Sequence, residues 1–219
     1  MEPLSDGLPR LYQSRYAEGK FHPTRNEPRR NLEPARVFKA KVCLIGEAAV
    51  GKTSLVRRYV EDAFDDRYIS TLGSKVSLKR IWLTPKGQQS QSLEVQISLW
   101  DLIGERSYLD TLHQDYLRGA HGLIAVCDLT RYSSFEALDD WIPRALRVTG
   151  EVPLVLVVNK TDLRDQVMCL YDDHEPAAKA DSYHGSAAWT SAKTGEHVND
   201  CFGQLAVEIV RRYAAPMLA

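Results

Sequence analysis

The segment from Gly46 to Thr53 constrains this chain more than any other part of the sequence. It reads Gly-Glu-Ala-Ala-Val-Gly-Lys-Thr and fits the pattern G-x-x-x-x-G-K-[ST] of a phosphate-binding loop. The glycines of the pattern let the backbone bend closely around a phosphate, where a side chain would intrude. Lys52 supplies a positive charge to the β- and γ-phosphates of a nucleotide, and the Thr53 hydroxyl is a ligand for Mg²⁺.

The segments on either side of this loop support the interpretation. Residues 41–45 form an apolar run typical of a buried strand, and residues 54–60 have apolar residues at helical spacing. The helix adds the positive end of its dipole to the N–H groups of the loop. A chance glycine-rich turn would lack this strand–loop–helix context. The predicted contact residues are Gly46, Glu47, Ala48, Ala49, Val50, Gly51, Lys52, Thr53 and Ser54.

Length and composition fit a single domain with an addition. The chain has 219 residues, enough to bury a substantial core, and its net charge of -1 gives no electrostatic case for nucleic-acid binding. The four cysteines show no C-x-x-C spacing, so we expect reduced thiols in a cytoplasmic protein. No apolar run approaches the roughly 18 residues of a membrane span, and the N-terminus lacks the apolar core of a signal peptide.

The N-terminal segment, residues 1–36, differs from the rest of the chain. It is basic, punctuated by proline and poor in periodic apolar residues, so we expect a flexible extension ahead of one domain at 37–219. Contact of its basic and aromatic residues with a partner or a membrane surface is the alternative. The C-terminal residues lack the cysteine of a prenylation signal, so we expect no lipid anchor and at most weak electrostatic contact with membranes.

Strands and helices alternate along the predicted domain, apart from one hairpin. The predicted strands are residues 41–45, 74–83, 93–100, 122–128, 152–158 and 187–189. The predicted helices are residues 54–60, 108–117, 134–148, 172–183 and 198–213. Ser133 or Ser134 is expected to cap the third helix, and Pro143 to kink or break it. The order predicts an α/β, doubly wound fold: a six-stranded, mostly parallel sheet with one antiparallel edge strand and helices on both faces.

Three further motifs follow predicted strands, as nucleotide loops do at the carboxyl edge of such a sheet. They are Asp101-x-x-Gly104, Asn159-Lys160-Thr161-Asp162 and Ser191-Ala192-Lys193. Together with the phosphate-binding loop, this set resembles the motifs of Ras-superfamily small GTPases, closest to the Rab branch. The segments at 119–122 and 190–195 are similar to Rab segments almost letter for letter. The resemblance covers about residues 37–213 and implies the G-domain fold of P-loop NTPases.

The motif at 159–162 favours guanine over adenine. The Asp162 carboxylate can accept hydrogen bonds from both N1–H and the exocyclic amine of guanine, a donor pair that adenine lacks. Asn159 fits the role of tying the base loop to the phosphate loop, and the Lys160 stem can pack along the base. By resemblance, the base site also includes Leu163, Ser191, Ala192 and Lys193, with the Ala192 N–H directed at guanine O6. A protein that uses ATP is the weaker alternative.

The resemblance also implies a switch that depends on the γ-phosphate. Thr71 resembles the threonine that completes Mg²⁺ coordination, and the metal ligands so implied are Thr53, Thr71 and Asp101. Gly104 matches the glycine whose N–H contacts the γ-phosphate. Loops at about 64–75 and 101–112 are therefore expected to order with GTP and loosen with GDP. Phe64 either covers the base or ribose or packs in the core, and both interpretations remain open.

Glu105 departs from the family pattern, which usually has glutamine here to orient the attacking water. A carboxylate keeps the acceptor of that glutamine and loses its donor. The expected catalytic set is Lys52, Thr71, Gly104 and Glu105. The expected function is a Mg²⁺-dependent switch that binds GTP and GDP, hydrolyses GTP slowly, and works with effectors and with exchange and activating proteins. The alternative is a nucleotide-dependent protein-binding module with negligible GTP turnover.

Overall fold

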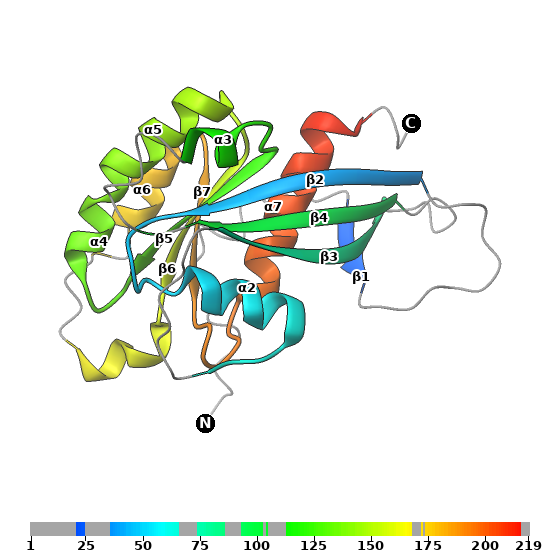
Figure 1. The fold of residues 1–219 in the computed structure, drawn as a ribbon. Coiled ribbons are helices and arrows are strands. Elements are labelled where there is room, and N and C mark those ends of the chain that lie inside the picture. Colours follow the sequence, from blue (N-terminus) through cyan, green and yellow to red (C-terminus); the bar gives the residue numbers. More distant parts are fainter. Residues whose placement is uncertain are drawn as a thin grey trace.

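The computed structural model describes residues 21–24, 36–65, 74–85, 93–102, 104, 113–167, 172 and 174–215, with the backbone alone described for 21–24, 84–85 and 113. Its centre is one sheet of seven strands in the order β1-β3-β4-β2-β5-β6-β7 (Figure 1). The strands are β1 (Phe21–Thr24), β2 (Arg36–Ile45), β3 (Ser74–Pro85), β4 (Leu93–Leu102), β5 (Gly122–Asp128), β6 (Leu154–Asn159) and β7 (Ser186–Thr190).

Strand directions confirm the doubly wound, mostly parallel sheet. Every pair of neighbouring strands among β2, β4, β5, β6 and β7 is parallel, whereas β3 is antiparallel to β4. The expectation of six strands is short by one, because β1 pairs with β3 in antiparallel register. An unpaired edge strand exposes backbone donors and acceptors, and β1 pairs with β3 over residues 82–85. Among the described residues, the antiparallel strand β3 is therefore covered by β1 over residues 82–85 and keeps its predicted place at the edge of the sheet over residues 74–81.

Helices cover both faces of the sheet, as expected. The helices are α2 (Lys52–Glu61), α3 (His113–Leu117), α4 (Tyr132–Glu136), α5 (Leu138–Thr149), α6 (Glu175–Ser182) and α7 (Val198–Tyr213), with a 3₁₀ helix η2 (Thr161–Gln166). Helices α2 and α7 pack together on one face, where the rings of Tyr59 and Phe202 stack 4.1 Å apart. Helices α3 to α6 bury their apolar side chains on the other face (Figure 1). None of the helices in the described part of the chain could cross a membrane.

The helix predicted at 134–148 differs from the structure in its start and its interruption. It is divided at Ala137 into α4 and α5, and α5 continues through Pro143 to Thr149. Neither predicted serine caps it, because Ser134 lies inside α4 and its hydroxyl contacts the backbone N–H of Asp128 at 2.9 Å. The serine thus fastens α4 to the turn after β5. The Ser134 hydroxyl thus accepts the hydrogen bond of a backbone N–H in that turn, and the spacing of apolar residues did not predict this contact.

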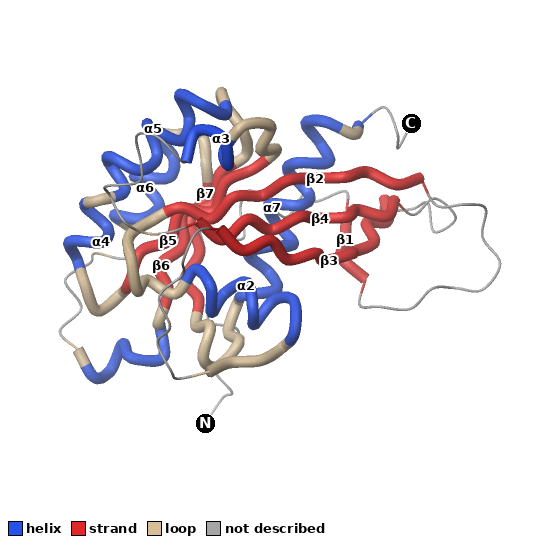
Figure 2. The backbone as a smooth tube through the Cα atoms, viewed as in Figure 1, coloured by secondary structure: helices blue, strands red, loops and turns tan. Residues whose placement is uncertain are grey.

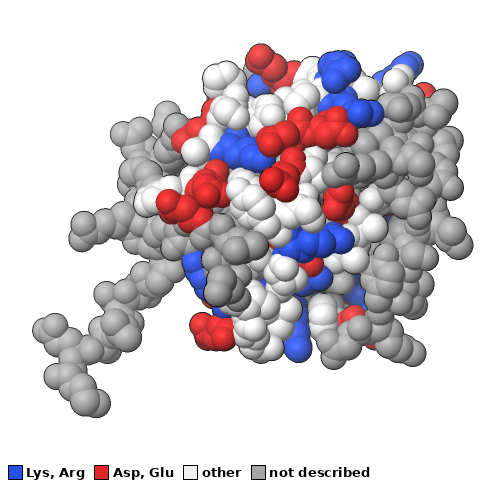
Figure 3. All heavy atoms as spheres, turned by 90° about the vertical axis from the view of Figure 1, so that its left-hand side faces the viewer, with Lys and Arg blue, Asp and Glu red and all other residues white. Residues whose placement is uncertain are grey.

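The loops that follow the parallel strands gather at one edge of the sheet (Figure 2). Acidic and basic side chains are interspersed on the molecular face that carries α4, α5 and α6 (Figure 3). Cys43, Cys127 and Cys201 are buried and form no disulfide among the described residues, and Cys169 lies outside them. Burial raises the pKa of the Cys201 thiol to about 12, so this thiol stays protonated at neutral pH.

Candidate nucleotide-binding site

Strand register brings the ends of the motif-bearing strands together. Leu44 of β2 lies opposite Asp101 of β4, so this carboxylate stands beside the start of the phosphate loop. On the other side of β2, Asp128 of β5 lies opposite Asn159 of β6, which lies opposite Thr190 of β7. Residues far apart in sequence therefore meet at the carboxyl edge of the sheet, where open α/β sheets bind their ligands.

The phosphate loop runs from β2 into α2 and requires glycine at two positions. Gly46 and Gly51 have φ angles of 131° and 98°, which lie in the left-handed region that glycine adopts without strain. A Cβ atom on Gly46 would also collide with the backbone of Val126, and one on Gly51 with the side chain of Asn159. Glycine therefore lets the loop lie against both β5 and the end of β6.

Lys52 is buried at the start of α2 and fixed by the loop that precedes it. Its Nζ atom donates hydrogen bonds to the carbonyl oxygens of Gly46 at 2.7 Å and Glu47 at 2.8 Å. Burial lowers the pKa of Lys52 to about 8, with Asp101 opposing this and Arg131 adding to it. A phosphate group beside the ammonium would favour its charged form. The buried lysine therefore fits a role as a cation for an anionic ligand.

Thr53 and Asp101 form the part of the site suited to a metal ion. The Thr53 hydroxyl donates to one carboxylate oxygen of Asp101 at 2.5 Å. The other oxygen is buried and has no hydrogen-bond partner among the described residues. Burial raises the pKa of Asp101, while the Thr53 hydroxyl and the Lys52 charge oppose the rise. A hydroxyl and a carboxylate are hard oxygen ligands of the kind that Mg²⁺ prefers, so the residues present fit this ion.

Asn159 joins three segments through one buried side chain. Its Nδ2 atom donates to the Val50 carbonyl of the phosphate loop at 3.0 Å. Its Oδ1 atom accepts from the Thr190 hydroxyl at 3.2 Å and from the Ala192 backbone N–H at 3.1 Å. Both polar atoms of this amide group are thus engaged by the protein itself. This side chain therefore links the phosphate loop directly to the loop at 190–192.

Lys160 and Asp162 follow Asn159 in the sequence, and each side chain contacts a different neighbour. The Ser191 hydroxyl donates to Asp162 Oδ1 at 2.6 Å, which orients the carboxylate. The Lys160 ammonium lies 2.6 Å from the Asp128 carboxylate, which is 6% exposed. This ion pair directs the lysine side chain back across the end of β5. Leu163 lies in η2 and Ser54 in the first turn of α2.

Gly104 approaches the phosphate loop so closely that no other residue fits. A Cβ atom at this position would collide with the backbone of Glu47 and Ala48. Phe64 is half-buried and packs against the core cluster that contains α2 and α7, which is the packing interpretation of this residue. Thr71 and Glu105 lie outside the described residues.

Three residues of the site were missed by the interpretation of the sequence. Arg58 of α2 donates to the carbonyl oxygens of Ala192 at 2.9 Å and Lys193 at 2.6 Å, so it supports the loop at 191–193. Asp128 holds Lys160, and Arg131 donates to the Ala48 carbonyl at 2.6 Å. The sequence carried no signal for these contacts. The residues around an arginine in a helix or turn look the same whether its side chain faces solvent or contacts another loop.

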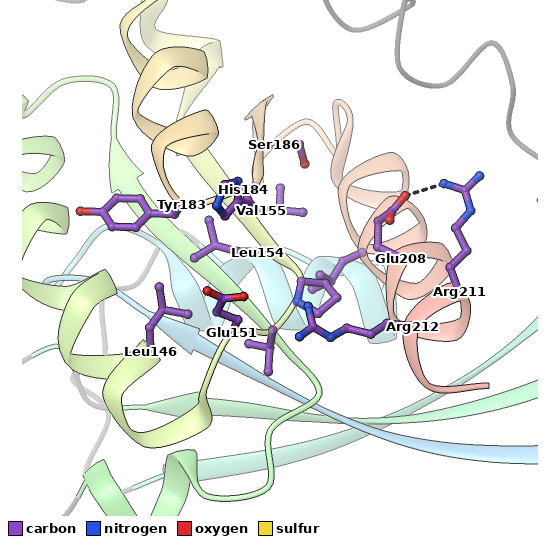
Figure 4. A pocket seen from close by; sticks show the side chains of 14 residues that line it. Leu146, Glu151, Leu154, Val155, Tyr183, His184, Ser186, Glu208, Arg211 and Arg212 are labelled. Atoms are coloured by element: carbon purple, nitrogen blue, oxygen red, sulfur yellow. Dashed lines mark hydrogen bonds and ion pairs between the residues drawn. The ribbon is translucent and has the colours of Figure 1, made fainter. Parts of the chain in front are cut away.

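A separate cavity of about 560 Å³ lies at the opposite end of the sheet (Figure 4). It opens where β6 and β7 begin, between the end of α5 and the last turns of α7. Glu208 and Arg211 form an ion pair of 2.6 Å at one side of it. Ligands of open α/β sheets bind outside the carboxyl ends of the strands, so this cavity is not the candidate site.

Comparison with known proteins agrees with the architecture and with the motifs at this edge. A model of the Ras family matches residues 41–211. The Ras-related protein Rab-1D of Dictyostelium discoideum is 33% identical over 185 residues, which span 84% of this chain and 86% of that protein. The region matched by the family model contains the phosphate loop, the Asp101 strand end and both loops joined by Asn159. The chain therefore belongs to the Ras family of small GTP-binding switch GTPases and is Rab-like.

Proposed function

We propose that this protein is a Mg²⁺-dependent guanine-nucleotide switch that binds GTP and GDP and hydrolyses GTP slowly to GDP and phosphate. The observation that carries the proposal is the Asn159 junction, which fixes the phosphate loop against the loop at 190–192. A nucleotide bound to the phosphate loop would place its base between Asp162 and the Ala192 N–H. The Asp162 carboxylate matches the two donors on the Watson–Crick edge of guanine, and the Ala192 N–H, which donates to Asn159 Oδ1 in the structure, would be shared with the guanine O6 acceptor.

The phosphate side of the proposed site relies on positioning and charge. Lys52 and the N–H groups of the loop hold the phosphates, and Thr53 with Asp101 and Thr71 would hold Mg²⁺, which neutralises charge on the β- and γ-phosphates when bound. Gly104 lies against the phosphate loop, which suits a contact between its N–H and a γ-phosphate. The segments at 64–75 and 101–112 then report the γ-phosphate to protein partners. These partners are effectors and exchange or activating proteins.

Guanine selectivity is tested by competition among GTP, ATP and XTP. The unmodified protein is expected to prefer GTP over ATP by at least about 100-fold, because adenine lacks the paired N1–H and amine donors that the Asp162 carboxylate accepts from guanine. Replacing Asp162 by asparagine exchanges two acceptors for one donor and one acceptor, so preference moves toward xanthine. Equal affinity of the unmodified protein for ATP and GTP would refute the proposal.

Turnover is tested by single-turnover phosphate release from bound GTP, with Mg²⁺ and with EDTA. Glu105 can polarise a water molecule, but it brings negative charge beside the triphosphate, and much of the charge stabilisation in this chemistry comes from an arginine of a partner. We expect slow release that Glu105→Gln changes while GTP affinity stays nearly constant. Identical rates in both proteins would remove Glu105 from the catalytic set.

A nucleotide-dependent binding module with negligible turnover is the second candidate, favoured by the glutamate at position 105. Phosphate release no faster than that of GTP in buffer would select it. We also propose a cytoplasmic location, with contact between residues 1–36 and anionic membranes limited to weak electrostatic attraction. Sedimentation with vesicles of anionic phospholipid at low and high salt tests this, and binding that survives high salt would contradict it.

A further inference from the structure

Arg131 reaches the phosphate loop from a different part of the chain. It lies in the turn after β5, where it forms an isolated bridge with Asp128. Its Nη2 atom donates to the Ala48 carbonyl at 2.6 Å and lies 4.0 Å from the Glu47 carboxylate. None of the four nucleotide motifs includes this residue. Two contacts to the middle of the loop therefore come from a side chain to which the motifs assign no role.

The hydrogen bond to the Ala48 carbonyl fixes the orientation of the peptide unit that joins Ala48 to Ala49. The described residues contain no cis peptide bonds, and in a trans peptide the C=O and N–H groups point in opposite directions. Because Arg131 holds the Ala48 carbonyl, the Ala49 N–H points away from Arg131. This N–H is one of the donors available to a phosphate on the concave side of the loop.

Ala49 needs such support because its backbone conformation is unfavourable. Its φ angle is 64°, in the left-handed region, which is unfavourable for a residue with a Cβ atom. A glycine could adopt this angle freely, but alanine requires surrounding contacts to hold it. The hydrogen bond from Arg131 acts on the peptide unit that joins Ala48 to Ala49, so it holds the strained residue from its N-terminal side.

The guanidinium also adds charge at the loop. A positive charge held 2.6 Å from the Ala48 carbonyl adds to the positive potential that an anionic ligand of the loop would meet. The Nε atom of Arg131 is buried and has no hydrogen-bond partner among the described residues. The 4.0 Å ion pair with Glu47 is half-exposed and is expected to contribute little by itself. The hydrogen bond to Ala48 is therefore the contact with the larger consequence.

We propose that Arg131 is a positioning residue of the phosphate loop, which aims the Ala49 N–H at the β-phosphate and so selectively strengthens the binding of guanine nucleotides that carry one. This inference rests on the proposed function, because it takes a guanine nucleotide as the ligand of the loop. It assigns to the turn after β5 a role in holding nucleotide. The role depends on one hydrogen bond and one positive charge.

The test compares Arg131→Met with Arg131→Lys and with Arg147→Met, a charge-loss control at an exposed position of α5. Arg131→Met is expected to speed the dissociation of both GDP and GTP by about tenfold, the effect of losing one hydrogen bond from a charged donor. Arg131→Lys keeps a cation and a donor and is expected to lie between Arg131→Met and the unmodified protein. Arg147→Met is expected to match the unmodified protein.

Competition with GMP separates positioning from general loosening of the loop. GMP lacks a β-phosphate, so its affinity is expected to be the same for the unmodified protein and for the Arg131→Met variant. Equal weakening of GMP and GDP would overturn the proposal, because it would show that the whole loop is disturbed. Slower hydrolysis of bound GTP with unchanged GDP dissociation would also overturn it, because the guanidinium would then act on the γ-phosphate.

Failure of this inference is distinguishable from failure of the proposed function. An unmodified protein that does not prefer GDP to ADP refutes the proposed function. An unmodified protein that prefers GDP, with Arg131→Met dissociating no faster than Arg147→Met, refutes only the role of Arg131. Circular dichroism of the nucleotide-free proteins checks that the variants fold. If Arg131→Met does not fold, Arg131→Lys is compared with Arg147→Met instead. Nucleotide dissociation from Arg131→Lys at the rate of the unmodified protein would then count against a role for the hydrogen bond from the guanidinium to Ala48.

Discussion

The base side and the metal side of the candidate site differ in how their polar groups are satisfied. On the base side, the Asn159 amide engages three protein groups and Asp162 accepts from Ser191. On the metal side, Asp101 keeps one buried oxygen that has no hydrogen-bond partner among the described residues. A satisfied polar network rigidifies a fold, whereas a buried unsatisfied group costs stability until a ligand completes it. The base side is thus satisfied by contacts within the fold, whereas the metal side leaves one carboxylate oxygen unsatisfied among the described residues.

The largest effect is expected from Asn159→Ala. This change leaves the Val50 carbonyl, the Thr190 hydroxyl and the Ala192 N–H without their partner, and each unsatisfied buried group costs about 1–3 kcal/mol. We expect the nucleotide-free protein to lose about 2–4 kcal/mol of unfolding free energy, measured by urea denaturation. Thr190→Val removes one of these bonds and is expected to cost less. An equal loss in both variants would show that the amide is not the centre of the network.

Asp101→Asn is expected to act in the opposite way. It removes a buried charge, so the nucleotide-free protein should be as stable as the unmodified protein or more stable. The strengthening of GDP binding by Mg²⁺ should fall by at least about tenfold, because an amide oxygen is a weaker ligand for this ion than a carboxylate. Titration calorimetry with and without EDTA measures this, and Asp115→Asn, at an exposed position of α3, is the control. A stability loss as large as that of Asn159→Ala would remove the contrast between the two sides.

Arg58→Met is expected to have a moderate effect that stays on the base side. It removes the donors to the Ala192 and Lys193 carbonyls, so the loop at 191–193 loosens and GDP dissociates about five- to tenfold faster. Arg57→Met on the same helix is the matched control, because Arg57 forms half-exposed ion pairs with Glu61 and Asp65 instead. The dependence of affinity on Mg²⁺ should be unchanged in both variants, and a changed dependence would couple the two sides.

The smallest effect is expected from His121, at the far end of β5 from the site. The Lys41 backbone N–H donates to His121 Nδ1 at 3.1 Å, and burial, aided by the Lys41 charge, lowers the pKa of this histidine. The folded state therefore favours the neutral ring, and the unfolded state binds the extra proton as pH falls below about 6.5. Stability should decrease as pH falls through that range, and His121→Gln should lessen the decrease. Thermal unfolding between about pH 5 and 8 measures it, and an unchanged slope would exclude His121.

The parts of the fold and site that follow from local spacing were predictable from the sequence. The strand at 122–128 and the helix at 198–213 match the structure in their bounds, because their apolar periodicity is uninterrupted. The contact of Asn159 with the phosphate loop was predictable because its motif follows a strand at a known edge. By contrast, β1 and the division at Ala137 depend on pairing with β3 and on the Ser134 hydroxyl, which are contacts between segments.

The supporting arginines could not be predicted for the same reason. Arg58 is separated from Lys193 by 135 positions, and Arg131 from Ala48 by 83, so no local pattern links them. Their function depends on which loops the sheet brings together. The contacts of Thr71 and Glu105 remain predictions, because both residues lie outside the described part of the chain.

The contacts of the Asn159 side chain also determine at which stage of synthesis and folding the nucleotide site is complete. It joins Val50 to Ala192, so nearly the whole domain must have left the ribosome and folded before the junction closes. A nascent or truncated chain that ends before residue 192 would have the phosphate loop but not the frame that separates base from phosphate. We therefore expect bound nucleotide to stabilise a chain that contains residue 192, by mass action, and to protect it from proteolysis better than a chain truncated before that residue.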